Sequence, residues 1–308
     1  TNSTIDNCKF DGTVLSACAA SFTSSSGTNG ASAVAAGIVA YAINTNVTNC
    51  TITGTIETSK GQFTAGVAGH FEGGKIDNCK VERSAYIYSS MNHTGGIVGR
   101  MTKDAEITNC VVDTPILCGW ATNGGIAGRM QSGVISNCIV TSNSEVVGHK
   151  GQSAVTYTDT GGLVGTIQTA ANLGTKVIIK DCACYANVTA NTYLGGLFGQ
   201  VKATKGTCEA YIVNCLFDGH LTCVSKNTYN YGVAGGIVGS SNNSNEMEKV
   251  HYVNCVLTAS SSTRLQPAQA MAVFRVTTST RTTWQVTAIS TSLTSSRRRI
   301  RLSRSIAT

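Results

Sequence analysis

The sequence predicts an all-β protein, a right-handed parallel β-helix (β-solenoid) of about seven to eight coils, followed by a non-repeat C-terminal tail. Two repeated motifs predict this fold. An Asn-Cys pair recurs through residues 1–259, and a glycine box such as "GGIVG" lies between successive pairs. The apolar residues at the box centres are 29, 30, 29, 37, 34 and 40 residues apart: Ile38, Val67, Ile97, Ile126, Leu163, Leu197 and Ile237. A period of this size with variable insertions is typical of a solenoid.

The Asn-Cys pair predicts a corner of each coil. The residue three before the cysteine and the residue two after it are apolar in every unit, from Ile5 and Phe10 to Tyr252 and Leu257. Residues two apart on a strand share a face and residues three apart do not, so the chain must bend just before the cysteine. Asn tolerates the left-handed conformation that such a bend needs. The expected corner residues are Asn7, Asn49, Asn78, Asn109, Asn137, Asn214 and Asn254, with Asp181 as a variant. The expected inward cysteines are Cys8, Cys50, Cys79, Cys110, Cys138, Cys182, Cys215 and Cys255.

Each unit is then expected to contain three strands: the glycine box, a short strand that ends at the corner, and a third strand after it. Like strands of successive units would pair in parallel at about 4.8 Å. Glycine in the box suits a tight bend or a close approach of two backbones. A propeller needs four antiparallel strands and about 40 residues in each blade, and most units here are too short for that.

These motifs resemble the GLUG-type repeat of large exported bacterial proteins. The resemblance covers about residues 5–259 and consists of Gly-Gly-(Ile/Leu)-(Val/Ala/Phe)-Gly followed by Ile-x-Asn-Cys. That family includes cell-surface adhesin-like proteins and non-catalytic parts of immunoglobulin-cleaving peptidases, so it implies a bacterial protein that is secreted or displayed on the cell surface. The catalytic members need an HExxH zinc helix, which is lacking here.

The thirteen cysteines admit two interpretations. Stacked coils bring equivalent Cα atoms within reach of a disulfide. A small thiol also packs well against its copies above and below, and we favour this reduced, buried stack. No CxxC pair supports zinc, and no metal or cofactor is expected. The asparagines are expected to form a ladder of amide hydrogen bonds along the corner.

Catalytic motifs are lacking, so we expect no enzyme. The alternative is a carbohydrate-active β-helix enzyme, a polysaccharide lyase or glycoside hydrolase, whose carboxylates would cluster only in space. A cleft that holds two or more of four acids would favour this alternative: Asp159, Asp181, Glu209 and Asp218. The five histidines are expected to be exposed loop or edge residues: His70, His93, His149, His220 and His251.

Aromatic residues near long insertions are candidates for binding. Insertions of a solenoid tend to gather on one face, and that face often binds partners. The candidates for contact with a host or microbial glycan or protein surface are Trp120, Tyr157, Tyr229 and Tyr231. Adhesion or structural display is therefore the expected function.

Charge separates the repeats from the tail. Residues 1–259 contain fifteen basic and sixteen acidic residues, whereas residues 260–308 contain eight Arg, no acidic residue and no Gly. This basic tail is disordered, a separate module or the product of a shifted reading frame, of which we favour the last. No specific nucleic-acid signature is present. The longest apolar run, residues 31–43, is shorter than the roughly 20 residues that cross a bilayer. The chain starts within the repeat pattern, so we expect a fragment of a larger chain whose export signal lies upstream.

Overall fold

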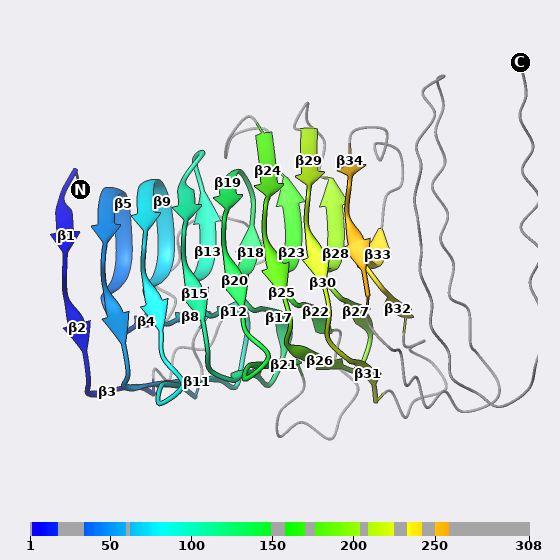
Figure 1. Ribbon diagram of the computed structural model, residues 1–308. Coiled ribbons are helices and arrows are strands. Elements are labelled where there is room, and N and C mark those ends of the chain that lie inside the picture. The colour runs from blue at the N-terminus through cyan, green and yellow to red at the C-terminus, as the bar shows by residue number, and fades with distance from the viewer. Residues whose placement is uncertain are drawn as a thin grey trace, which may run out of the picture.

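The computed structural model describes residues 2–17, 34–59, 62–148, 158–169, 176–203, 209–224, 233–241 and 250–258. Every described element is a β-strand, and every strand pair is parallel. The described residues include no helix that could cross a membrane. The basic tail at 260–308 lies outside the described residues. The parallel β-helix that the repeats predict is therefore the fold of the described chain (Figure 1).

A complete coil passes in turn through five rows of strands, which belong to four sheets. The first row, here called the box sheet, has seven strands that lead into the glycine boxes. They are β4 (Val34–Ala36), β8 (Phe63–Ala65), β12 (Thr94–Gly95), β17 (Ala121–Gly124), β22 (Thr158–Gly161), β27 (Tyr193–Gly195) and β32 (Val233–Gly235).

The next two rows belong to one 13-stranded sheet, here called the long sheet, because β5 (Val39–Thr48) and β9 (Ala68–Asp77) run through both. The row that follows the box continues with β13 (Val98–Thr102), β18 (Ala127–Met130), β23 (Val164–Thr169), β28 (Phe198–Ala203) and β33 (Val238–Ser241). The row that reaches the Asn-Cys corner contains β1 (Thr4–Asp6), β14 (Glu106–Thr108), β19 (Gly133–Ser136), β24 (Lys176–Lys180), β29 (Glu209–Val213) and β34 (Val250–Val253).

Two further sheets complete the coil. The eight-stranded sheet after the corner contains β2 (Lys9–Phe10), β6 (Thr51–Ile52), β10 (Lys80–Val81), β15 (Val111–Val112), β20 (Ile139–Val140), β25 (Ala183–Cys184), β30 (Leu216–Phe217) and β35 (Val256–Leu257). The last sheet contains β3 (Thr13–Ser16), β7 (Thr55–Thr58), β11 (Tyr86–Ser89), β16 (Ile116–Cys118), β21 (Glu145–Gly148), β26 (Asn187–Ala190) and β31 (Leu221–Cys223). In Figure 1 the chain descends on the near side and rises on the far side as the coils advance from left to right, so the winding is right-handed.

The glycine box is a corner between two strands, whereas the sequence suggested a strand. Gly95 ends β12, Gly96 and Ile97 form the bend, and Val98 begins β13. A Cβ on Gly96 would lie only 2.2 Å from the carbonyl oxygen of Gly125 in the next coil. The box therefore needs glycine because adjacent coils nearly touch there. A complete coil such as β12–β16 has five strands, two more than the repeat pattern suggested, and β5 and β9 each join two of these strands into one.

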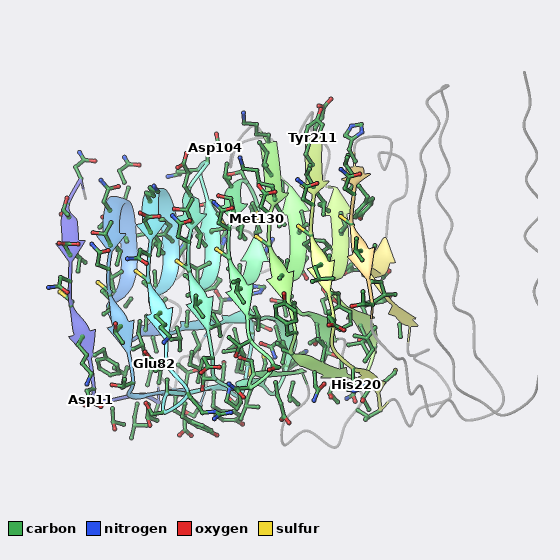
Figure 2. The ribbon with its side chains drawn as sticks, in the orientation of Figure 1. Asp11, Glu82, Asp104, Met130, Tyr211 and His220 are labelled. Carbon is green, nitrogen blue, oxygen red and sulfur yellow. The ribbon has the colours of Figure 1, made fainter. Side chains whose placement is uncertain are left out.

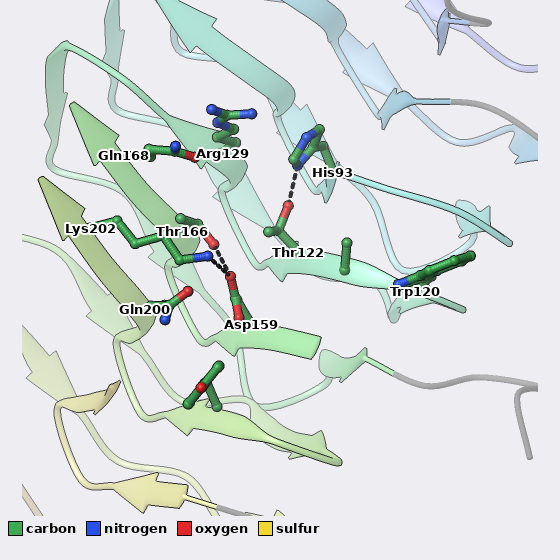
Figure 3. A pocket seen from close by; sticks show the side chains of 11 residues that line it. His93, Trp120, Thr122, Arg129, Asp159, Thr166, Gln168, Gln200 and Lys202 are labelled. Atoms are coloured by element: carbon green, nitrogen blue, oxygen red, sulfur yellow. Dashed lines mark hydrogen bonds and ion pairs between the residues drawn. The ribbon is translucent and has the colours of Figure 1, made fainter. Parts of the chain in front are cut away.

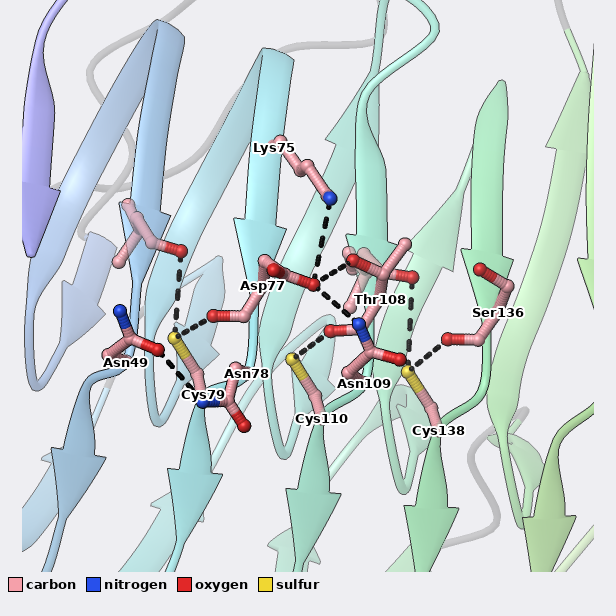
Figure 4. A network of polar contacts seen from close by, with 12 residues as sticks. Asn49, Lys75, Asp77, Asn78, Cys79, Thr108, Asn109, Cys110, Ser136 and Cys138 are labelled. Carbon is pink, nitrogen blue, oxygen red and sulfur yellow. Dashed lines mark hydrogen bonds and ion pairs between the residues drawn. The ribbon is translucent and has the colours of Figure 1, made fainter.

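The Asn-Cys corner has the left-handed geometry. The eight corner residues have φ between 51° and 56°: Asn7, Asn49, Asn78, Asn109, Asn137, Asp181, Asn214 and Asn254. Asn78 donates from Nδ2 to Oδ1 of Asn49 at 2.8 Å, and Asn109 donates to Oδ1 of Asp77 at 2.8 Å (Figure 4). The ladder along this edge thus joins amides and also carboxylates from the residue before the corner.

The core consists of columns that repeat from coil to coil. Ile107, Cys110 and Val112 are fully buried, and their counterparts in the central coils are buried as well. Each buried aliphatic side chain of this size contributes about 1.5–3 kcal/mol relative to exposure. In Figure 2 the buried Met130 lies between the sheets, whereas Tyr211 projects outward from β29.

The described cysteines are free thiols. Cys110 donates its thiol hydrogen to the carbonyl oxygen of Thr108 at 3.1 Å, and Figure 4 shows the same contact repeated in adjacent coils. Burial raises the pKa of the Cys50 thiol, and burial raises the pKa of Cys184 to about 12. Cys8, in the first coil, is exposed. The buried thiols therefore behave as apolar core residues.

Candidate binding site

Two columns of outward-facing residues flank the glycine boxes. One lies two residues before the first box position, on the box sheet, and the other lies five residues after it, on the long sheet. Strand register aligns the second column through the coils as Tyr41, His70, Arg100, Arg129, Thr166, Gln200 and Ser240. The first column consists of Val34, Phe63, His93, Thr122, Asp159, Tyr193 and Val233. Each coil thus contributes one pair of residues seven positions apart.

The two columns face each other because the last glycine of the box lets the sheets approach closely. A Cβ on Gly128 would lie 2.7 Å from the carbonyl carbon of His93 and 2.7 Å from the backbone nitrogen of Thr94. Gly128 belongs to the long sheet, and both contacted residues lie at or just before the box strand β12 of the preceding coil. This glycine therefore closes the angle between the sheets and brings the outward side chains together.

A pocket of about 370 Å³ lies between the columns (Figure 3). The box sheet and the turns that lead into it contribute His93, Trp120, Ala121, Thr122, Asp159 and Tyr193. The long sheet contributes Arg129, Thr166, Gln168, Gln200 and Lys202. The lining combines aromatic, amide and charged groups, which is the composition of a site for a polar ligand with one apolar face.

Asp159 is the carboxylate of this pocket. Its Oδ2 accepts a hydrogen bond from Thr166 Oγ1 at 2.7 Å and lies 3.2 Å from Lys202 Nζ. Burial raises the pKa of the Asp159 carboxyl, although Lys202 acts in the opposite direction. The charge of Asp159 is therefore matched locally by that of Lys202.

Arg129 is the second cation of the pocket. Its Nε is buried and has no hydrogen-bond partner. Burial and the neighbouring Arg100 lower the pKa of Arg129 to about 10, so the guanidinium is charged at neutral pH. Within the described part of the chain, no carboxylate forms an ion pair with Arg129 at 4 Å or less.

His93 shows that the expectation of exposed histidines was wrong at two positions. His93 is half-buried, shares a hydrogen bond between its Nδ1 and Thr122 Oγ1, and stacks on Phe63 with ring centroids 5.3 Å apart. Burial and nearby cations hold the pKa of His93 well below its ordinary value, so the ring is neutral. His70 is buried, because its ring lies between Tyr41 and Phe63.

A cluster of buried charge lies next to the pocket in the same columns. Glu72 accepts a hydrogen bond from Tyr41 at 2.8 Å and lies 2.6 Å from Lys103 Nζ. The Nε2 of His70 lies 3.4 Å from Glu72 Oε1 without a well-aligned hydrogen bond. Burial lowers the pKa of His70 to about 4. Lys103 balances the charge of Glu72 within this cluster. The cluster therefore supports the junction between the box sheet and the long sheet, and the Glu72 carboxylate has little hydrogen-bonding capacity left for a ligand.

The structure places one of the four aromatic candidates at the pocket. Trp120 lies just before β17, and its side chain is 43% exposed at the rim (Figure 3). Tyr157, Tyr229 and Tyr231 lie outside the described residues, as does His149.

Of the four acids that the enzymatic alternative invoked, Asp159 lines the pocket. Asp181 forms an Asn-Cys corner, where it accepts a hydrogen bond from Asn214 at 3.0 Å. Glu209 accepts a hydrogen bond from Tyr211 on the corner row, and Asp218 is exposed after β30. Among the described residues, no three His, Cys, Asp or Glu side chains are grouped as a metal site requires.

Sequence reasoning missed His93, Arg129 and Lys202. The signal that could have found the first two is the alignment of the glycine boxes. Positions two before and five after the box start vary from apolar to charged, whereas the positions inside the coil stay apolar. Binding residues are often found at outward positions whose residue type varies between repeats while the scaffold stays the same.

Comparison with known proteins agrees with the architecture. No protein family and no curated protein matches the sequence. A crystal structure of a candidate immunoglobulin A1 protease from Bacteroides ovatus is similar, with a TM-score of 0.52 and 19% identity. The alignment covers 78% of this chain and 76% of that chain. The two proteins share the β-helix fold. At this level of identity the likeness extends to the fold alone.

Proposed function

We propose that the protein is a non-enzymatic, exported or cell-surface β-solenoid that serves in adhesion or structural display and binds a glycan at the pocket beside Trp120. The observation that carries this proposal is an exposed indole on the rim of a pocket whose walls are polar. The apolar face of a sugar ring can lie against an indole while its hydroxyl groups meet hydrogen-bonding side chains.

The polar wall supplies groups that suit hydroxyls. Gln200 is buried at the pocket, and its Oε1 has no hydrogen-bond partner. Gln168 and Thr122 add further amide and hydroxyl groups to the lining. A buried acceptor without a partner costs about 1–3 kcal/mol, and a ligand hydroxyl would satisfy it.

The resemblance to GLUG-type repeats supports the location at the cell surface. The repeats also form a rod that grows by about 4.8 Å with each coil, and such a rod holds a site away from its point of attachment. Adhesion and structural display would therefore both use the length of this rod.

The enzymatic alternative receives less support from the geometry. Hydrolysis of a glycosidic bond ordinarily uses two carboxyl groups that face one bond. Asp159 lies in the pocket, whereas Asp181 and Glu209 lie on other edges of the coil. The arrangement of these acids thus favours binding over cleavage.

A glycan array probed with the full chain tests the proposal. We expect binding to a subset of glycans, and we expect Trp120→Ala to reduce that binding at least tenfold. Tyr185→Ala is the matched control, because Tyr185 is an exposed aromatic residue outside the pocket lining. The proposal fails if no glycan binds, or if both variants bind as the parent chain does. Release of shortened sugars during incubation would instead identify an enzyme.

A further inference from the structure

We propose that the pocket selects saccharides that carry an anionic group, a carboxylate or a sulfate, which binds Arg129 and Lys202 while the sugar ring lies against Trp120. This inference rests on the proposed glycan-binding function and names the chemical class of the ligand. It follows from the charges, the burial and the unused hydrogen-bonding capacity of the pocket.

Charge is unbalanced at the pocket. Arg129 and Lys202 line it, and Arg100 precedes Arg129 in the same column. Asp159 is the one acid among the lining residues, and Lys202 already pairs with it. The net charge of the described lining is therefore positive, and an anionic ligand would neutralise it.

Arg129 has hydrogen-bonding capacity that no other side chain uses. Its Nε is buried without an acceptor, although a guanidinium carries five N–H donors in a planar fork. Carboxylate and sulfate oxygens match this fork, and charge-assisted hydrogen bonds of this kind are about twice as strong as neutral ones. Burial strengthens the interaction because solvent screens it less.

The cationic groups and Trp120 lie on one face of successive coils. Arg129 follows Trp120 within one coil, on β18, and β23 separates β18 from β28, which carries Lys202. Lys202 reaches back toward β22, where its Nζ meets Asp159. At about 4.8 Å for each coil, the face from Arg129 to Lys202 extends roughly 10 Å along the axis. A ligand of one or two sugar residues would fit that length.

The amides add a second reason to favour an acidic sugar over a simple anion. Gln168 and Gln200 line the same pocket and cannot supply charge. They suit the hydroxyl groups that surround the acid group of a saccharide. The neutral His93 adds no charge on the other wall.

Calorimetric titration of the full chain with matched saccharides tests the inference. The probes are a trimer of galacturonic acid, its fully methyl-esterified form and a sulfated disaccharide of a glycosaminoglycan. Esterification removes the charge and keeps the sugar ring. We expect the acid to bind at least tenfold more tightly than its ester, and we expect added salt to weaken binding of the acid only. The sulfated probe shows whether carboxylate or sulfate is preferred.

Three variants separate charge from ring contact. Arg129→Gln should weaken the preference for the acid at least severalfold, and Arg129→Lys should restore part of it, because the charge returns without the fork. Trp120→Ala should weaken binding of the acid and the ester alike. Lys75→Gln is the control, since Lys75 is half-exposed, lies near the Asn-Cys corner beside Asp77 and is not among the residues that line the pocket. Circular dichroism and thermal unfolding confirm that each variant is folded.

The outcomes distinguish the two proposals. If acid and ester bind equally and Arg129→Gln changes nothing while Trp120→Ala weakens both, the charge inference is wrong and the glycan site stands. If no saccharide binds to the folded parent chain, here or on the array, both proposals fail. A salt dependence as steep in Arg129→Gln as in the parent chain would assign the anion to another cation and overturn the inference.

Discussion

Asn78 donates its Nδ2 hydrogen to Oδ1 of Asn49, which occupies the same corner one coil earlier, across 2.8 Å. Both residues have a positive φ, 51° and 56°. One residue type thus satisfies two demands, because asparagine tolerates the left-handed backbone and its amide can reach the adjacent coil. The corner of a coil is held by its own conformation and by its neighbour.

Replacement of a corner asparagine by glycine should cost less stability than its replacement by alanine. Asn109→Ala loses the hydrogen bond to Asp77 and strains the left-handed backbone, so we expect a loss of about 2 kcal/mol in the free energy of unfolding. Asn109→Gly keeps the backbone relaxed and should lose about 1 kcal/mol. Urea unfolding measures both, with the exposed Glu106→Ala as control. Equal losses for the glycine and alanine variants would contradict the role of the positive φ.

The last glycine of the box should not accept a methyl group. Gly128→Ala would place a Cβ 2.7 Å from the backbone at His93 and Thr94, so we expect destabilisation of about 3 kcal/mol or more. Gly12→Ala is the matched control, because its Cβ would meet only the Phe10 ring at an ordinary 3.6 Å. Thermal unfolding compares the two. Similar melting temperatures for both variants would refute the close approach of the sheets.

Acid should weaken the fold through His70. Its pKa of about 4 lies below the ordinary 6.5, so between these values the unfolded chain binds a proton that the folded chain does not. Stability therefore falls as pH is lowered through this window, by about 1 kcal/mol at pH 5.5 from this residue. His70→Gln should lose less stability between pH 7 and pH 5.5 than the parent chain. An unchanged pH slope in His70→Gln would disprove this.

Alkylation should distinguish Cys8 from the buried thiols. Cys8 is exposed, whereas Cys110 is fully buried. Since the thiolate is the reactive species, we expect iodoacetamide to modify Cys8 in the folded chain and Cys110 only after unfolding. Peptide mass spectrometry follows both sites, and Cys8→Ser identifies the fast reaction. Modification of Cys110 that needs a reductant even after unfolding would show disulfides in place of free thiols.

The sequence predicted those parts of the fold that repeat. Ile107, Cys110 and Val112 could be placed inside because their positions are apolar in every unit, and a bend was required between the first two. The box was misassigned as a strand because glycine is compatible with a strand, a bend or a close contact. The close approach of Gly96 to the neighbouring coil identifies the box as a bend, and this contact exists only when coils are stacked.

The pocket was less accessible to sequence reasoning for a physical reason. His93, Asp159 and Lys202 come from three different coils and do not repeat, so no motif connects them. Their burial depends on the angle between the box sheet and the long sheet, and this angle cannot be read from the sequence. Trp120 was one of four aromatic candidates chosen because insertions of a solenoid tend to gather on one face that often binds partners.

The paired columns beside the glycine boxes lie outside the packed interior of the coil. A substitution at one of these outward positions changes one rung of the surface while the inward residues of the same coil remain as they are. The outward pair of one coil can therefore be substituted without a change in the inward residues that pack the coils together. Insertion or loss of a whole coil would lengthen or shorten the two columns, so the set of outward side chains can change while the packed interior keeps its pattern.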